Sequence, residues 1–145
     1  MPAELPFAPV DSIIRRNANG LRVSADAGER LAEYIQIEGA RLAEIAAEKA
    51  DADNRKTLMA ADFDVSEAPA KEDVVLPIAP VDRIARLDID DRYRVSMEAR
   101  IALARILETF AEEVAIASAT LARHADRRTI TENDIQTYIE LQQRE

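Results

Sequence analysis

Two short segments of the chain combine adjacent cations with a hydroxyl group and a more distant aspartate. Residues 126–135 read DRRTITENDI, and residues 54–63 read NRKTLMAADF. In both segments the aspartate follows the first cation by seven positions. Cations and hydroxyl groups bind phosphate oxygens, and a carboxylate can pair with an arginine of the same loop. We therefore predict two anion-binding loops, each with an internal ion pair. The alternative is a solvated turn whose arginine only pairs with the aspartate.

These loops belong to the two copies of a tandem repeat. Residues 5–14 read LPFAPVDSII and residues 76–85 read LPIAPVDRIA, an offset of 71 that becomes 72 further along the chain. An internal repeat indicates that the fold is built from two similar units. The predicted organisation is a first fold over residues 1–64, a linker over 65–75 and a second fold over 76–145.

Each copy is predicted to form a short helix, a long helix and a second short helix. Pro9 and Pro80 suit a first helical turn, because the amide that proline lacks has no helical partner there. The first short helices are therefore expected over about residues 10–17 and 81–87. A third helix should follow each cationic loop, and in the second copy it should end near Gln143.

Each long helix is predicted to follow a serine N-cap, Ser24 or Ser96, and the first should extend to about Asp51. Apolar residues at alternating steps of four and three indicate the face that each helix buries. This seam is continuous in the second copy and interrupted by charged residues in the first. The second seam is Leu103, Leu107, Phe110, Val114, Ala117 and Leu121, and the first is Leu31, Ile35, Glu38, Leu42, Ile45 and Lys49.

A long helix flanked by two short ones cannot bury its seam alone. We therefore predict an all-α protein in which the two copies pack as an intramolecular handshake, a covalent pseudo-dimer. The start of each long helix then approaches the end of the other. Arg22 and Val23 should lie beside residues 127–129, and Arg94 should lie beside residues 55–57. Each cationic loop becomes half of a composite site.

The composition limits the remaining classes of function. The 19 Lys and Arg residues against 28 Asp and Glu residues argue against the usual basic footprint of a nucleic-acid binder. The absence of cysteine excludes disulfides and thiolate metal sites. We find no nucleophile with a base, no ligand cluster and no apolar run of membrane-spanning length. We expect no enzyme, no cofactor, no metal and no small-molecule substrate, in a soluble, intracellular protein that contacts no membrane.

The residues resemble those of a known family, the archaeal histones. The second copy carries the resemblance in LPIAP at 76–80, RVS at 94–96 and LARHADRRTI at 121–130, and the first copy matches more loosely from Leu5 to about Phe63. The chain is therefore similar to a histone doublet, two histone folds fused in tandem. Only three of the 19 cations are lysines, and an acidic, lysine-poor surface is similar to that of proteins from salt-accumulating halophiles.

The resemblance implies roles for individual residues in contacting DNA. Arg22 and Arg94 match the arginine that enters the minor groove. The phosphate-binding pairs are Lys56 with Thr57 and Arg128 with Thr129, and the arginines that brace the loops are Arg55 with Asp62 and Arg127 with Asp134. A further basic position on the first helix is kept as Arg83 but is Ser12 in the first copy, and the next turn offers Arg15 and Arg86.

The resemblance also implies an assembly interface built around a leucine, a histidine and an aspartate. Leu121, His124 and Asp134 match it in the second copy. The first copy has Lys49 and Ala52 at the first two places. We expect two doublets to join through their second copies and assembly to stop there.

Three functions remain open from the sequence. The chain is a chromatin protein of the nucleoid that binds and bends duplex DNA, or a site-preferring transcriptional regulator that uses the same surface. The third reading is a histone-fold interaction module with little DNA binding, and the acidic surface is the feature that favours it.

Overall fold

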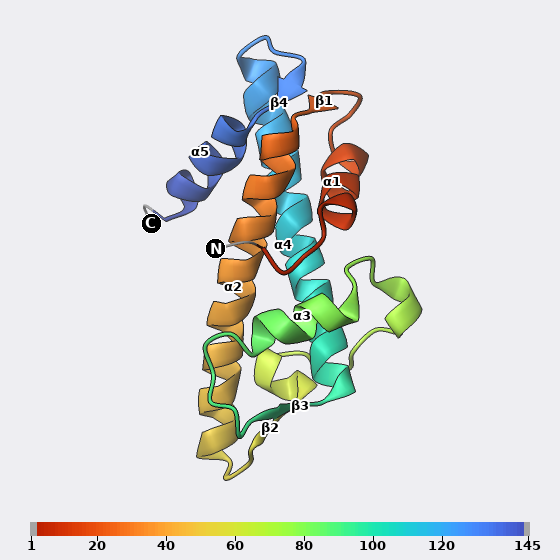
Figure 1. Cartoon of the computed structure of the whole chain (residues 1–145). Coiled ribbons are helices and arrows are strands. Elements are labelled where there is room, and N and C mark those ends of the chain that lie inside the picture. The colour runs from red at the N-terminus through yellow and green to blue at the C-terminus, as the bar shows by residue number, and fades with distance from the viewer. Residues whose placement is uncertain (1–2, 144–145) are drawn as a thin grey trace. The chain divides into compact units, whose positions relative to one another are not determined.

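The computed structural model describes residues 3–143. Its regular secondary structure consists of helices and four two-residue strands (Figure 1). The chain divides into two compact units. Unit 1 comprises Met1–Ile35 and Thr109–Glu145, and unit 2 comprises Gln36–Glu108. The long helices α2 (Ala25–Ala52) and α4 (Met97–His124) each contribute to both units. Each unit is thus built from both sequence copies, as expected of tandem histone folds that pack in a handshake.

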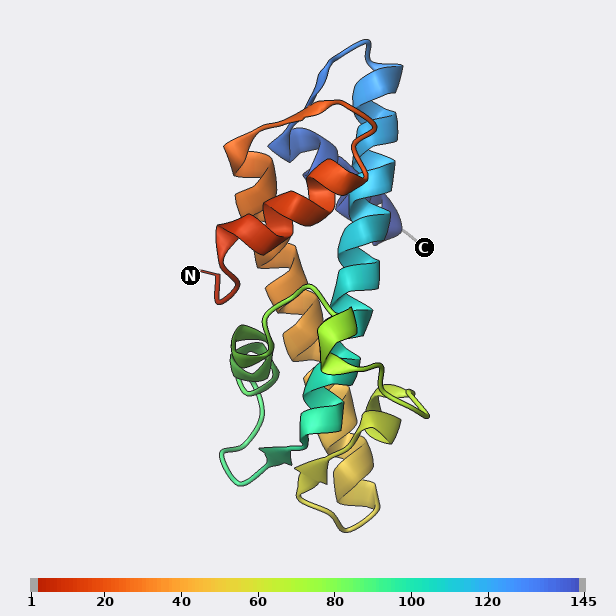
Figure 2. The ribbon, with the colours of Figure 1, turned by 90° about the vertical axis from the view of Figure 1, so that its right-hand side faces the viewer.

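Unit 1 holds α1 (Phe7–Arg16), β1 (Arg22–Val23), β4 (Thr129–Ile130), α5 (Glu132–Gln142) and parts of α2 and α4. Within it, α1 lies across the α2 and α4 segments, and α5 lies on their other side (Figure 1, Figure 2). Its core gathers fully buried residues from all of these helices, with Val10, Ile13, Ile14, Leu31, Ile35, Val114 and Ile135 among them.

Unit 2 holds β2 (Thr57–Leu58), α3 (Ile78–Ala85), β3 (Arg94–Val95), the 3₁₀ turns η1 (Ala60–Phe63) and η2 (Lys71–Asp73), and the other parts of α2 and α4. The three helices approach closely at Gly39. A Cβ atom there would lie 2.6 Å from Cγ2 of Ile84 and 3.0 Å from Cδ1 of Leu107. Glycine is unfavourable inside a helix, so this close approach is the physical reason for its presence.

The short helices begin one turn earlier than predicted. Pro6 and Pro77 are the N-caps of α1 and α3, with φ of −66° and −68° and extended ψ. Pro9 and Pro80 still lie in the first turn, where they remove no helical hydrogen bond. The serine N-caps are confirmed, since Ser24 Oγ accepts the amide of Ala27 at 3.3 Å and Ser96 Oγ accepts that of Ala99 at 3.0 Å.

A third helix follows the cationic loop in both copies, but the two differ in length. In the second copy, α5 ends at Gln142, close to the predicted position. In the first copy it is only the four-residue 3₁₀ helix η1. Asp64 adopts φ of 62° after η1, and the amide of Val65 closes the turn on the carbonyl of Ala60 at 3.1 Å. A left-handed residue ends a helix, and here it does so after one turn.

The predicted seam of α2 is also wrong in its second half. Ile45 is 38% exposed and Lys49 is exposed. The buried face instead consists of small residues, Ala43, Ala46, Ala47 and Ala50. Alanine allows neighbouring backbones to approach closely, so this face buries little volume per residue. In α4 the prediction holds for Leu103, Leu107 and Val114, which are fully buried, while Phe110, Ala117 and Leu121 are partly exposed.

The segment predicted as a linker is anchored to α4. The backbone amide of Val75 donates a hydrogen bond to the buried carboxylate of Glu108. Arg105 donates to the carbonyl of Asp73, the last residue of the turn η2, at 2.9 Å. Two side chains of α4 thus hold this stretch by its backbone. No helix within residues 3–143 is long and apolar enough to cross a membrane.

Candidate nucleic-acid interface

Each unit contains one pair of parallel strands that joins the two copies. In unit 1, β1 pairs with β4, with Arg22 opposite Thr129. In unit 2, β2 pairs with β3, with Thr57 opposite Arg94. The bonds are equivalent. The amide of Arg22 donates to the carbonyl of Arg128 at 2.8 Å, as the amide of Arg94 does to that of Lys56.

We call Arg22, Arg128 and Thr129 edge 1, and Arg94, Lys56 and Thr57 edge 2. The alternation of side chains along a strand explains how each edge faces outward. Ile130 and Leu58 are fully buried, and Val23 and Val95 are 8% and 4% exposed. Their neighbours Arg22 and Arg94 are consequently exposed. The expected juxtaposition of each arginine with the opposite loop is present in both units.

A left-handed residue leads from each long helix into its cationic loop. Asn54 and Asp126 have φ of 58° and 59°, a conformation that asparagine and aspartate tolerate better than most residues. The next amide then bonds back to the helix. Arg55 N–H reaches the carbonyl of Ala50 at 2.8 Å, and Arg127 makes the equivalent bond at 2.9 Å. These closures fix the point where each loop leaves its helix.

The first loop is braced by the arginine that precedes Lys56. Arg55 makes two hydrogen bonds to the buried carboxylate of Asp62, at 2.9 and 2.8 Å, and a third to the carbonyl of Thr57 at 2.8 Å. The Arg55 guanidinium lowers the pKa of Asp62, and the amide of Met59 adds a hydrogen bond at 2.8 Å. The brace therefore holds the backbone of β2 itself.

The second loop repeats this arrangement. Arg127 bonds to Asp134 at 2.9 and 2.5 Å and to the carbonyl of Thr129 at 3.0 Å. Burial raises the pKa of Asp134, but the hydrogen bonds from Arg127 and from the amide of Thr131 outweigh it, so the net shift is downward. Both oxygens of Asp134 are occupied within the chain, which leaves this buried side chain little capacity for a second molecule.

The free cations are not distributed equally between the edges. Arg22, Arg128 and Arg94 are exposed, and within residues 3–143 the structure assigns none of them a side-chain hydrogen bond or ion pair. Lys56 differs. Its ammonium lies 2.7 Å from a carboxylate oxygen of Asp51. It also lies 4.9 Å above the ring of Tyr93.

The predicted cations of the short helices are also engaged within the chain. Arg15 pairs with Asp11 at 2.6 Å, one turn earlier on α1. Arg86 pairs with Asp82 at 3.1 Å and donates to the carbonyl of Tyr93 at 3.3 Å. Arg83 is exposed and has a partner in the chain as well. Their charge is therefore less available than that of edge 1.

The predicted assembly residues lie at the end of α4 and the start of α5. Leu121 is partly exposed and His124 is exposed, while Asp134 is buried. The corresponding place in unit 2 is different in kind, since Lys49 pairs with Asp64 at 2.9 Å beside the shortened η1.

Sequence reasoning missed two residues of this surface, Asp51 and Tyr93. Asp51 stands five positions before Lys56, across the helix end, so the pattern of the loop alone did not include it. It also missed the ion pair between Arg30 and Glu132 at 2.7 Å, which links α2 to α5 within unit 1. No group of three potential metal ligands gathers anywhere in residues 3–143.

The comparisons with known proteins agree with this geometry. The family model described as histone-like transcription factor (CBF/NF-Y) and archaeal histone matches residues 3–65 and again residues 74–139. The chain belongs to this histone family. The membership supports a histone-like, DNA-binding role and no enzymatic one.

Individual relatives match one copy or the fold. The archaeal histone HAN1 of Thermococcus zilligii is 45% identical over 60 residues, which cover 41% of this chain and 87% of the relative. DNA polymerase epsilon subunit 3 of Drosophila melanogaster is 41% identical over 71 residues, 48% of this chain and 56% of the relative. The crystal structure of the histone from Methanopyrus kandleri covers 90% of both chains with a TM-score of 0.64 and 23% identity. A crystal structure from Thermus thermophilus covers 92% of this chain and 93% of its own, with a TM-score of 0.61 and 17% identity.

Proposed function

We propose that the chain binds and bends duplex DNA, with edges 1 and 2 as its contacts, in the organisation of chromatin. The observation that supports this most directly is the repeated pairing of an exposed arginine with a cation and threonine loop, Arg22 with Thr129 and Arg94 with Thr57. Family membership and the archaeal histone relative are consistent with it.

In this proposal the two kinds of edge residue act differently. The loop cation and threonine bind phosphates, Arg128 with Thr129 and Lys56 with Thr57. Arg22 and Arg94 enter the minor groove where it faces the protein. Such contacts hold and bend the duplex with little direct reading of base identity. Any sequence preference then follows the deformability of the DNA.

The net charge of −9 sets the conditions under which this binding occurs. A protein of this charge repels DNA on average, so attraction must come from the local cations of the edges. Salt screens repulsion between distant charges, with a Debye length of about 3 Å at 1 M. It also reduces the gain from counterion release. Binding should therefore be confined to the edges and show a shallow dependence on salt.

A duplex-binding titration from low to multi-molar KCl tests the proposal. The double variant Arg22→Ala/Arg94→Ala should bind more weakly than the wild type. A matched control, Arg41→Ala/Lys71→Ala, removes two exposed cations that lie outside both edges and should bind nearly as well as the wild type. If the wild type and the edge variant bind equally poorly at every salt concentration, the DNA-binding proposal is wrong.

A second candidate, a site-preferring transcriptional regulator, is favoured by the family description, which includes histone-like transcription factors. Genome-wide occupancy separates the two, because packaging predicts continuous coverage and regulation predicts isolated peaks. An interaction module within a larger complex is the third candidate, and the relative named as part of a DNA polymerase is its precedent. Failure of all duplex binding would favour that third function.

Self-association is proposed only for the second copy. Leu121 and His124 have exposed surface at the end of α4, where α5 is a full helix of 11 residues. At the equivalent place in unit 2, Lys49 carries charge and η1 is one turn long. Two doublets would pair through their second copies and leave the other ends free.

A further inference from the structure

We infer that the two edges are unequal, with edge 1 as the primary DNA contact and Asp51 as an intramolecular competitor that occupies Lys56 of edge 2. This inference rests on the proposed function and adds a regulation of the same surface. A DNA phosphate can pair with Lys56 only by displacing the carboxylate of Asp51. Among residues 3–143, Arg128 of edge 1 has no such partner to displace.

The ammonium of Lys56 is held from two directions. Asp51, in the last turn of α2, contributes a carboxylate oxygen at 2.7 Å. Tyr93, next to β3, contributes its aromatic ring at 4.9 Å from the nitrogen. The hydrogen bond from Lys56 lowers the pKa of Asp51, and a hydrogen bond from Tyr93 lowers it further. The three side chains therefore form one small cluster in which the carboxylate stays ionised and close to the cation.

The equivalent positions of edge 1 hold no such cluster. With the offset of 72 that relates the copies, Asp51 corresponds to Arg123 and Tyr93 corresponds to Leu21. The competing carboxylate is thus replaced by another cation. Arg123 and Arg128 are both exposed, and the structure assigns neither an ion pair within residues 3–143. At these two matched positions unit 1 has two exposed cations, Arg123 and Arg128, whereas unit 2 has Lys56 paired with Asp51.

The loops around each edge extend this difference. Residues 14–22 and 121–129, around edge 1, contain six cations and one acid. The matching residues 86–94 and 49–57, around edge 2, contain six cations and five acids. Arg92, for example, is paired with Asp90 at 3.0 Å. Attraction to a polyanion depends on the local charge, so it is much stronger at edge 1.

The exposure of the ion pair between Asp51 and Lys56 indicates how strongly Asp51 competes with a DNA phosphate. Both Asp51 and Lys56 lie at the surface, with side-chain exposures of 53% and 52%, and ion pairs this exposed break easily. Asp51 therefore weakens the second contact without blocking it. When Lys56 leaves Asp51 for a phosphate, the unpaired carboxylate attracts a cation from solution, which offsets part of the counterion release from the DNA. DNA at limiting concentration should engage edge 1 first.

A double-mutant cycle on duplex DNA, with the full chain, tests this inequality. In the wild type, Arg128→Ala should lower the slope of log affinity against log salt by about 0.9, the value for one phosphate contact. Lys56→Ala should lower it clearly less. Asp51→Asn should tighten binding and steepen the slope, and Lys56→Ala in that background should become as damaging as Arg128→Ala. Arg123→Gln, at the matching position of edge 1, should weaken binding.

Two controls keep the outcome specific. Asp88→Asn removes an acid from the same region and should tighten binding less than Asp51→Asn does. Thermal unfolding of every variant checks that each is folded. Equal losses for Lys56→Ala and Arg128→Ala in the wild type, with no effect of Asp51→Asn, would overturn the inequality while leaving DNA binding intact. If no variant or wild type binds duplex at any salt concentration, the proposed function itself fails, and this inference fails with it.

Discussion

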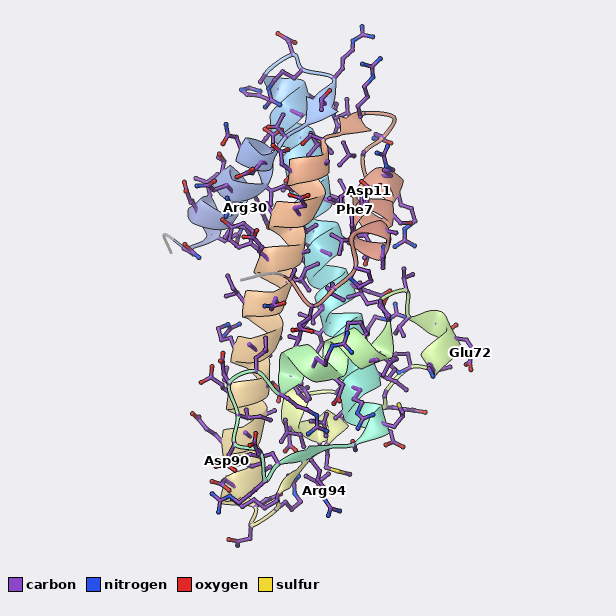
Figure 3. The ribbon with its side chains drawn as sticks, in the orientation of Figure 1. Phe7, Asp11, Arg30, Glu72, Asp90 and Arg94 are labelled. Carbon is purple, nitrogen blue, oxygen red and sulfur yellow. The ribbon has the colours of Figure 1, made fainter. Side chains whose placement is uncertain are left out.

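The amide of Arg22 donates a hydrogen bond of 2.8 Å to the carbonyl of Arg128, a residue from the other sequence copy. This bond places two exposed guanidinium groups on one edge of unit 1, together with the hydroxyl group of Thr129 (edge 1). Figure 3 shows the side chains and labels Arg94, which has the equivalent position in unit 2. Each edge therefore rests on a buried strand residue, Ile130 in β4 or Leu58 in β2, which holds its strand against the core.

Removing the anchor beneath edge 1 should impair both stability and binding. Ile130 is fully buried next to Thr129 in β4. Ile130→Ala should lower the free energy of unfolding by about 2–5 kcal/mol, because it deletes a packed side chain and leaves a cavity. Duplex affinity should fall as well, since the strand that carries Thr129 loses its anchor. Chemical denaturation and a binding titration measure the two effects. Ile116→Ala, at a position that is 53% exposed, should change neither by much.

The braces predict a loss of stability in acid. The pKa values of Asp62 and Asp134 are lowered in the folded chain from about 3.8, so the unfolded chain binds protons at a higher pH than the folded one. Their contribution is complete above pH 3.8 and is lost as the pH falls through the lowered values. Denaturation midpoints measured from pH 6 to pH 2 should fall steeply at the acid end.

Asparagine substitution isolates that contribution. Asp134→Asn should lower the free energy of unfolding at pH 7 by about 1–3 kcal/mol, since it weakens charge-assisted hydrogen bonds in a buried position. It should also flatten the acid dependence. An unchanged acid dependence in Asp62→Asn/Asp134→Asn would show that other carboxylates control it.

The close approach at Gly39 predicts that a better helix former will destabilise unit 2. Gly39→Ala gains about 1 kcal/mol of helix propensity. Its methyl group, however, would lie 2.6 Å from Cγ2 of Ile84, and overpacking of this kind costs about 1–3 kcal/mol. The thermal midpoint should therefore fall. Ile84→Ala removes the opposing methyl group, so the double variant should be less destabilised than the sum of the two single variants, and strict additivity would contradict the contact.

Assembly through the second copy predicts a change of mass in solution. His124→Ala should reduce the mass measured by light scattering if doublets pair at the end of α4. Lys49→Ala, at a place that corresponds to Leu121 in the other copy, should leave the mass unchanged. A wild type that is monomeric at all concentrations would show that this surface is not used. A reduced mass for both variants would indicate that the two ends are not distinguished.

The sequence predicted the elements well where the signal was local and repeated. The serine caps, the extent of α2, and the pairing of Arg22 with the opposite loop follow from residue types and from the offset between copies. The predictions failed where tertiary packing or the path of the backbone determines which residues are buried and where a helix ends. The alanine face of α2 is less hydrophobic than its exposed Ile45, so hydropathy alone selected the wrong side.

The cations and hydroxyl groups proposed for the candidate site were selected from the sequence, whereas the carboxylate that pairs with Lys56 was not. Arg128 and Lys56 occupy equivalent loop positions, and the sequence offers no reason to treat them differently if only the loops are compared. The difference lies across the end of the helix, where Asp51 folds back on Lys56 at 2.7 Å. A contact across a left-handed turn depends on the path of the backbone, which the repeat pattern does not report. The shortened η1 was missed for the same reason, since Asp64 decides it by its conformation.

Residues 65–75, which Glu108 and Arg105 anchor to α4, join the two copies in a single polypeptide. In a homodimer of identical chains, every substitution is inherited by both ends at once, so neither end can specialise alone. Here residues 51 and 123 are encoded separately, and Asp51 is an acid where Arg123 is a cation. Covalent fusion thus allows the residues around edge 1 and edge 2 to differ, which identical chains in a homodimer cannot do.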